Sequence, residues 1–422
     1  MGYKPTATYI NTKSVINTVA VKTAYKYRAY PSKAQKETLD KQMFIAKELY
    51  NILLERSKAY YKETGKTLTE YRMNIWITQM KKERPEFSEL HSQVLQNVSR
   101  RVSDAYRHFF RRCREKKQGK KVKVGFPRYK KFVSSLTYPQ ANGFRIEKKR
   151  VELSKAGRIN FVNHRDIEGK PKTCTIKKTK SGEWYITISV EKEAMGFASN
   201  NKPQIGLDLG LREYATLSDN TKIPNLRFGK QSRKKAKRLQ QRISRKQKGS
   251  VNRHKAVLKF ARLSESIANR RNDFAHKLSI SLVRSYSFIA YEDLQVQNMA
   301  KNHHYAKSIN DVSWSRFTQF LCYKAESAGC RVVDVPPQYT TQTCNECRNI
   351  QEVEKGATVY ICGRCGLQID RDLNASINIL RIGLEKSSTT EGHSGSQASG
   401  DDVRPSAREA VADESGTIWV AS

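Results

Sequence analysis

Three acidic residues lie within or beside segments whose sequence pattern otherwise predicts a strand or a helix. Asp208 interrupts the apolar run 205–210, and Glu292 follows the apolar run 288–291. Asp372 comes directly before a helical pattern. Because a carboxylate at the end of an apolar strand is costly unless it is paired or bound to a cation, these residues are candidates for a divalent-metal site.

Each of these carboxylates also has an ordinary structural explanation. Asp372 could cap a helix, and Glu292 could be the first polar residue after a strand. Together, three carboxylates that converge at strand ends and a helix start can hold two Mg²⁺ ions roughly 4 Å apart, which is the chemistry of phosphodiester hydrolysis. Asp293 points to the opposite face of its strand. Asp370 remains an alternative to Asp372 on this evidence.

Half of the eight cysteines form a second candidate metal site. They make two C-x-x-C knuckles separated by fourteen residues: Cys344, Cys347, Cys362 and Cys365. This spacing is typical of structural zinc, in which four thiolates leave no open coordination position. A redox pair or unligated thiols are the alternatives. Gly366 follows the second knuckle but Arg348 follows the first, so we expect a less relaxed turn there.

The composition points to a polyanionic partner. The chain has 422 residues, 38% of them hydrophobic, and a net charge of +39. Such charge repels itself unless a polyanion neutralises it, and counterion release makes nucleic acid the natural one. No apolar run approaches the roughly 18 residues of a membrane span, and no secretory signal is visible. We expect a cytoplasmic protein without a membrane partner, located on the nucleoid when it binds DNA.

A basic stretch at 227–260, which we expect to be helical, is the candidate surface for that partner. Its first half contains eight lysines and arginines between 234 and 248 with no acidic residue among them. A charge run is usually a solvated helix face, but without balancing carboxylates a role facing phosphates is the better hypothesis. The residues we expect to contact nucleic acid are Lys234, Lys235, Arg238, Arg242 and Arg245.

The elements that position these residues fall into regions of different pattern. Residues 32–118 show the helical periodicity of two helices, the first of which starts at a capping box of Ser32 and Gln35. Residues 121–200 alternate as antiparallel strands, with a turn at 181–182, and we expect the early strand 21–29 to belong with them. From Pro203 the pattern is α/β, with strands at 205–210, 288–291 and 331–335 and a helix at 317–325.

Short motifs in order along the chain resemble the TnpB family of transposon-encoded RNA-guided nucleases. They include Tyr27-Arg-Ala-Tyr-Pro31, Gly125-Phe-Pro-Arg128, Gly206-Leu-Asp-Leu-Gly210, Glu292-Asp-Leu294 and Asp370-Arg-Asp-Leu-Asn-Ala375. The segment from Tyr339 to Cys344 also matches. The resemblance covers the chain from about Tyr25 to Arg381.

The resemblance implies a multidomain fold of α/β and β parts. Its parts would be a wedge β-barrel-like domain (21–31 and 119–202) with an inserted helical recognition domain (32–118), followed by a ribonuclease-H-like, RuvC-like nuclease domain (203–343 and 366–386) that carries an inserted zinc ribbon (344–365). We expect residues 1–20 to be an N-terminal extension. The Ser/Gly/Thr-rich residues 387–422 are expected to be a disordered tail.

The resemblance also implies the activity. The family's acidic residues match Asp208, Glu292 and Asp372, which selects Asp372 over Asp370. The protein would be a metal-dependent endodeoxyribonuclease with two catalytic Mg²⁺ ions and one structural Zn²⁺. It would act as a monomer on a guide RNA from the transposon end and cut double-stranded DNA beside a short motif. Gln96 and Asn142 are our candidates for reading that motif, because Gln and Asn can bond adenine bidentately.

Other functions remain open on the sequence. A nuclease-inactive, RNA-guided DNA-binding repressor would be expected to lack the carboxylates, and all three are present. A compact type V CRISPR effector shares the same features. An unguided nuclease or transposase would use the same metal chemistry without RNA.

Overall fold

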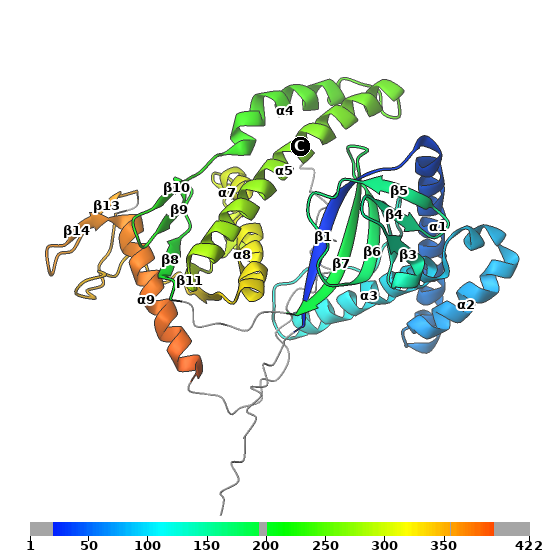
Figure 1. Ribbon diagram of the computed structural model, residues 1–422. Coiled ribbons are helices and arrows are strands. Elements are labelled where there is room, and N and C mark those ends of the chain that lie inside the picture. Colours follow the sequence, from blue (N-terminus) through cyan, green and yellow to red (C-terminus); the bar gives the residue numbers. More distant parts are fainter. Residues whose placement is uncertain (1–19, 194–200, 355, 392–422) are drawn as a thin grey trace, which may run out of the picture. The chain divides into compact units, whose positions relative to one another are not determined.

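The computed structural model describes residues 20–193, 201–354 and 356–391. The chain folds into two compact units, one of residues 22–192 and one that begins at residue 193 (Figure 1). Residues 1–19 of the expected N-terminal extension and residues 392–422 of the expected tail lie outside the described residues. Among the described helices, none combines the length and apolar character of a membrane span.

The first unit contains a seven-stranded sheet in the order β2-β6-β7-β1-β5-β4-β3. The strands are β1 (Ala20–Tyr30), β2 (Ser135–Tyr138), β3 (Phe144–Ile146), β4 (Arg150–Leu153), β5 (Gly157–Phe161), β6 (Lys170–Lys178) and β7 (Trp184–Glu193). Along β7 every second side chain is buried, as the alternating sequence predicts. The early strand β1 lies between β7 and β5, so the helices that follow it are inserted into a β unit.

Three helices fill that insertion: α1 (Lys33–Thr64), α2 (Glu70–Glu83) and α3 (Ser92–Lys117), with a short 3-10 turn η1 (Pro85–Glu89) between the last two. The capping box predicted for α1 is present, since Ser32 and Gln35 bond each other's backbone N–H groups. The sequence patterns predict only two helices here. The third, α2, buries only Met73, Ile77 and Met80, a stripe too narrow to stand out.

The second unit is built on a mixed five-stranded sheet in the order β10-β9-β8-β11-β12. The strands are β8 (Gln204–Asp208), β9 (Glu213–Leu217), β10 (Lys222–Pro224), β11 (Phe288–Glu292) and β12 (Arg331–Val335). β11 runs parallel to both of its neighbours, β8 and β12, and β9 is antiparallel to β8. A small hairpin of β13 (Val359–Ile361) and β14 (Gln368–Asp370) leads into the last helix.

Helices cover both faces of this sheet. The helices of the unit are α4 (Phe228–Ser244), α5 (Val251–Ser285), α6 (Val296–Met299), α7 (Ala306–Val312), α8 (Trp314–Ala328) and α9 (Arg371–Glu391). Leu282 of α5 and Phe317 of α8 share a core with Leu207 and Ile289 of the strands. Ala290, the next residue of β11, instead joins a core with α9. Successive residues of β11 thus pack against helices on opposite faces of the sheet.

The helix α9 lies unusually close to the sheet. A Cβ atom at Gly206 would stand 2.1 Å from the backbone oxygen of Ser376, and one at Gly383 would stand 2.5 Å from Cβ of Ala290. Neither distance leaves room for a methyl group. Gly206 on β8 and Gly383 on α9 are therefore the contacts that let the helix dock.

Two boundaries differ from the predictions. The basic stretch 227–260 is not one helix, because α4 ends at Ser244 and α5 begins at Val251, with Gly249 in the turn at φ +86°. The last helix also runs to Glu391, so residues 387–391, which we assigned to the tail, are helical. Serine and threonine are weak helix formers but do not stop a helix that is already docked.

Replacing Gly206 with alanine tests the docking of α9. The new methyl group must displace helix backbone, and overpacking of this kind typically costs about 1–3 kcal/mol. We expect a lower free energy of unfolding for Gly206→Ala, measured by thermal or urea denaturation. Gly125→Ala is the control, because that position is open. Equal stability of the two variants would contradict the close approach.

Candidate functional site

Asp208 and Glu292 end two neighbouring parallel strands. In the register of β8 and β11, Leu207 lies opposite Tyr291, so the next residues, Asp208 and Glu292, emerge side by side. Side chains alternate along a strand, and Gly206 faces α9. Asp208 therefore points to the α9 side of the sheet. Glu292, two residues beyond a residue of the α9 core, does the same.

Asp372 lies in the first turn of α9, but the helix cap is Asp370. The Oδ1 atom of Asp370 accepts hydrogen bonds from the backbone N–H groups of Asp372 (3.0 Å) and Leu373 (3.1 Å). Its Oδ2 pairs with Lys222 Nζ at 2.7 Å. Partial burial raises the pKa of Asp370, but the bond from Lys222 and the backbone donors outweigh it and leave the pKa below its usual range. The capping role thus belongs to Asp370, and Asp372 is left for another role.

The three predicted carboxylates lie close enough to interact electrostatically. Burial, and then the negative charges of Glu292 and Asp372, raise the pKa of Asp208 to about 8, while Arg371 works against the shift. Burial also raises the pKa of Glu292, and a bond from the Thr340 hydroxyl lowers it. Like charges at close range disfavour joint ionisation, so a bound cation would favour the charged forms of Asp208 and Glu292.

The side chain of Arg371 already places a positive charge beside one of these carboxylates. The guanidinium of Arg371 donates to Asp372 Oδ1 from Nη2 at 2.8 Å and from Nε at 3.2 Å. Among the described residues, only the cysteines bring three or more potential ligand atoms within 4.8 Å of one another, so the carboxylate oxygens are more widely spaced. The donor set contains only oxygen and so fits Mg²⁺.

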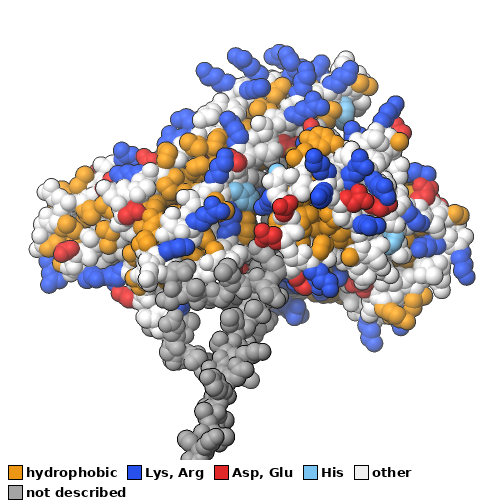
Figure 2. Space-filling view, in the orientation of Figure 1, with side chains coloured by type: hydrophobic (Ala, Val, Ile, Leu, Met, Phe, Trp, Pro, Cys, Tyr) orange, Lys and Arg blue, Asp and Glu red, His pale blue; other side chains and the backbone are white. Residues whose placement is uncertain are grey.

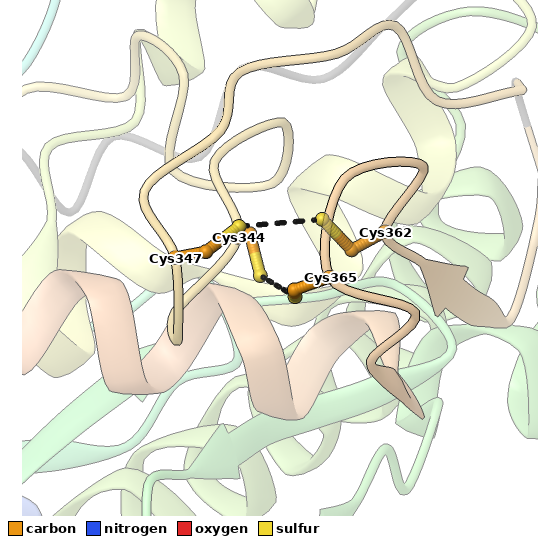
Figure 3. A group of neighbouring side chains, drawn as sticks. All are labelled: Cys344, Cys347, Cys362 and Cys365. Carbon is orange, nitrogen blue, oxygen red and sulfur yellow. Dashed lines mark hydrogen bonds between the residues drawn. The ribbon is translucent and has the colours of Figure 1, made fainter.

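The four predicted cysteines gather into one cluster, with Sγ atoms within 4.8 Å of one another. Cys344 Sγ lies 3.7 Å from Cys365 Sγ, and Cys347 Sγ lies 3.5 Å from Cys362 Sγ (Figure 3). Tetrahedral thiolate bonds of about 2.3 Å require S–S separations of roughly 3.8 Å. All four thiols are free. The cluster is positioned to hold one metal ion.

The turns of the two knuckles are alike in shape but not in residue. Gly366 has φ +75°, and Arg348, at the same place in the first knuckle, has φ 63°. The expected less relaxed turn is therefore present, since an arginine adopts a left-handed conformation at some cost. In the second knuckle the backbone N–H of Cys365 holds the pKa of the Cys362 thiol at about 6, against partial desolvation. Such N–H donors favour the thiolate that binds metal.

Sequence reasoning missed three buried polar residues between the two sites. Thr340 is 1% exposed, and Asn374 and Asn378 on α9 are 0% and 1% exposed. Both asparagines donate to backbone oxygens of the segment that leads to Cys344. Their four-residue spacing on the apolar face of a helix is a signal that could have found them, because a buried amide needs a partner.

The basic candidates lie on an exposed helix. Lys234, Lys235, Arg238 and Arg242 are exposed on α4, which has no buried residue, and Arg245 follows its last turn. Figure 2 shows Lys and Arg side chains gathered over this part of the molecule. Asp311 anchors the start of α4. Its carboxylate accepts from the N–H groups of Gly229 and Lys230 and pairs with Arg271 at 2.6 Å.

The two candidates for base recognition belong to the other unit. Gln96 is exposed on α3, and Asn142 is exposed in the short 3-10 turn η2 (Ala141–Gly143). Gln93, one turn before Gln96, donates to the side chain of Asn142 and, at 3.0 Å, to that of Gln140. This bond ties the start of α3 to the loop that carries Asn142.

Three family models match the chain. A model described as a probable transposase matches residues 187–303, a Cas12f1-like TNB domain matches residues 314–379, and a helix-turn-helix domain matches residues 20–66. The TNB match includes all four cysteines. Residues 20–66 form strand β1 and the single helix α1 in the structure, rather than two helices joined by a turn.

Full-length relatives and a solved structure extend these matches. The chain is 30% identical over 380 residues to the putative RNA-guided DNA endonuclease InsQ of Escherichia coli (strain K12), covering 85% of this chain and 92% of that relative. Its fold resembles that of Cas12f1 in a complex with sgRNA and target DNA, with a TM-score of 0.53 at 12% identity over 85% of this chain and 98% of that one. Several relatives that match over shorter stretches are named TnpB-like proteins.

A relative from Streptomyces pristinaespiralis, named a putative RNA-guided DNA endonuclease, shares 31% identity over 396 residues, which are 91% of this chain and 92% of that relative. A match of this extent covers both units and both candidate metal sites. With the probable-transposase model over residues 187–303, it shows that this chain belongs to the TnpB family.

Proposed function

We propose that the protein is a transposon-encoded, RNA-guided and Mg²⁺-dependent DNA endonuclease whose catalytic residues are Asp208, Glu292 and Asp372. The observation that carries the proposal is the convergence of three carboxylates from β8, β11 and α9 into one field that raises the pKa of Asp208. The names of the relatives support guidance by RNA and action on DNA. The structural neighbour, Cas12f1 in a complex with sgRNA and target DNA, shares the fold.

The chain's own residues would prepare the site for hydrolysis. Bound Mg²⁺ supplies an activated water and charge stabilisation for the leaving oxygen. Asp208 and Glu292 are fixed by strands and Asp372 by a capped helix, so the three ligand groups come from rigid elements. Arg371 adds a positive charge beside Asp372 that can face a phosphate.

The other parts of the chain receive roles from the same proposal. We assign Zn²⁺ to the four cysteines, guide or target backbone contacts to the basic residues of α4, and motif recognition to Gln96 and Asn142. The β unit with its inserted helices would be the wedge and recognition domains, and the unit from residue 193 the RuvC-like domain. Guide RNA from the transposon end and double-stranded target DNA are the expected partners.

Loss of one carboxylate tests the catalytic assignment. Asp208→Ala should abolish Mg²⁺-dependent cleavage of a guided DNA target while RNA and DNA binding are retained, as measured by gel assays with the copurified RNA. Asp293→Ala is the matched control, because Asp293 lies just past the end of β11 and is exposed. Cleavage that survives in Asp208→Ala would overturn the site.

The same preparation separates the alternative functions. Protein freed of RNA by nuclease treatment should lose cleavage and regain it when the RNA is added back. Activity of RNA-free protein on duplex DNA would favour an unguided nuclease. Guided binding without cleavage by the wild-type protein would favour a repressor.

The raised pKa of Asp208 predicts a pH dependence of stability in Mg²⁺-free buffer. The folded protein keeps a proton on Asp208 up to about pH 8, whereas an unfolded Asp loses it near pH 4. The free energy of unfolding should therefore fall between these values as pH rises. Asp208→Asn should lack this contribution, melting like the wild type near pH 4 and at a higher temperature above pH 8. Parallel melting curves across the pH range would contradict the shift.

The two knuckle turns give a paired prediction for the cysteine cluster. Arg348→Gly should relieve the strain of the left-handed backbone conformation at this turn. The free energy of unfolding should therefore rise by up to about 1 kcal/mol. Gly366→Ala should lower it by a similar amount, because its φ is positive but the space around it is open. Zn²⁺ retention against a competing chelator, followed by metal analysis, measures both. The opposite order of retention would show that the turns do not limit metal binding.

A further inference from the structure

The carboxylate of Glu292 has one fixed hydrogen-bond partner. Thr340 Oγ1 donates to Glu292 Oε1 at 3.0 Å, and both residues are buried, at 1% and 9% exposure. A hydroxyl has a single proton, and its other acceptor, the Pro337 oxygen, lies farther away at 3.4 Å. The bond to a charged acceptor is the stronger one. Thr340 therefore orients Oε1 and leaves Oε2 of Glu292 to face the site.

The backbone of Thr340 is in turn held by α9. Asn378 Nδ2 donates to the backbone oxygens of Thr340 at 3.1 Å and Thr343 at 2.7 Å. Asn374 Nδ2 donates to the same Thr343 oxygen at 2.8 Å, and its Oδ1 accepts from the N–H of Asn345 at 2.9 Å. The two asparagines thus bind the segment 340–345 at both of its ends.

That segment contains the first ligand of the cysteine cluster. Cys344 lies between the two residues that Asn374 holds, and only four positions separate it from Thr340. On the other side, Cys365 leads through β14 to Asp370, which caps the helix that carries Asp372. Bound to a metal ion, the four cysteines would hold both of these paths in place. Buried hydrogen-bonded links of this kind transmit small displacements, because the surroundings are close-packed.

We propose that Thr340 is a positioning residue for Glu292 and that the four-cysteine metal site holds Thr340 in place through residues 340–345 and the asparagines of α9. The proposal rests on the proposed nuclease function of the carboxylates. It gives the cysteine site a second task, setting the geometry of the acidic site, in addition to holding its own ribbon. The competing explanation is that Thr340 only satisfies a buried carboxylate.

Isosteric substitution of the full-length protein distinguishes these explanations. Thr340→Val removes the hydroxyl at nearly constant volume, and Thr340→Ser restores it. We expect the valine variant to need on the order of tenfold more Mg²⁺ for half-maximal cleavage, and the serine variant to return toward the wild type.

A measurement without nucleic acid keeps the test independent of cleavage. Mg²⁺ should raise the melting temperature of the wild type and of Thr340→Ser more than that of Thr340→Val. Thr341→Val is the matched control, a half-buried neighbour for which the described structure shows no side-chain bond. If the proposed nuclease function fails, no variant will cleave, yet the Mg²⁺-dependent melting still reports on Thr340.

The link to the cysteines is tested by a double-mutant cycle. Cys365→Ser, at the exposed cysteine, should weaken the response to Mg²⁺ in the same direction as Thr340→Val. The double variant should respond to Mg²⁺ as strongly as the single variant with the smaller response, because both changes break the same path. Fully additive effects would overturn the link. An unchanged Mg²⁺ response in Thr340→Val would overturn the positioning role itself.

Discussion

The candidate acidic site depends on how closely α9 approaches the sheet. Two of its carboxylates are fixed by adjacent parallel strands, but Asp372 belongs to a helix that follows more than 70 residues after Glu292. The helix reaches the strand ends only because Gly206 and Gly383 remove the side chains that would hold it away. If a methyl group at either position held α9 farther from the sheet, Asp372 would move away from Asp208 and Glu292 and no longer interact with them electrostatically.

Bringing carboxylates together has an electrostatic cost that the chain offsets locally. Lys222 neutralises Asp370, Arg371 pairs with Asp372, and Thr340 donates to Glu292. Asp208 has no such partner among the described contacts, and burial together with its acidic neighbours raises its pKa to about 8. A bound cation would offset both effects at Asp208.

The sequence predicted what is encoded locally. Strand periodicity located β11 and β12 within a residue, and the C-x-x-C spacing identified the four thiols that gather. Which aspartate caps α9 was settled only by the fold, because Asp370 and Asp372 look alike in sequence. Thr340, Asn374 and Asn378 were missed since the partners that link the two sites lie 29–48 residues away. The split of the basic stretch at Gly249 depended on a turn that periodicity does not register.

A last consequence concerns how a phosphodiester could approach an acidic site on a chain of net charge +39. The carboxylate edge itself repels phosphate, so attraction must come from elsewhere in the chain. The helix α4 meets that need, since it buries no side chain and has no acidic residue to cancel its charge. The start of α4 is fixed by Asp311, whose carboxylate accepts hydrogen bonds from backbone N–H groups in the first turn of the helix. Binding and chemistry would then rest on separate elements of one unit, with opposite charges, and neither would compromise the other.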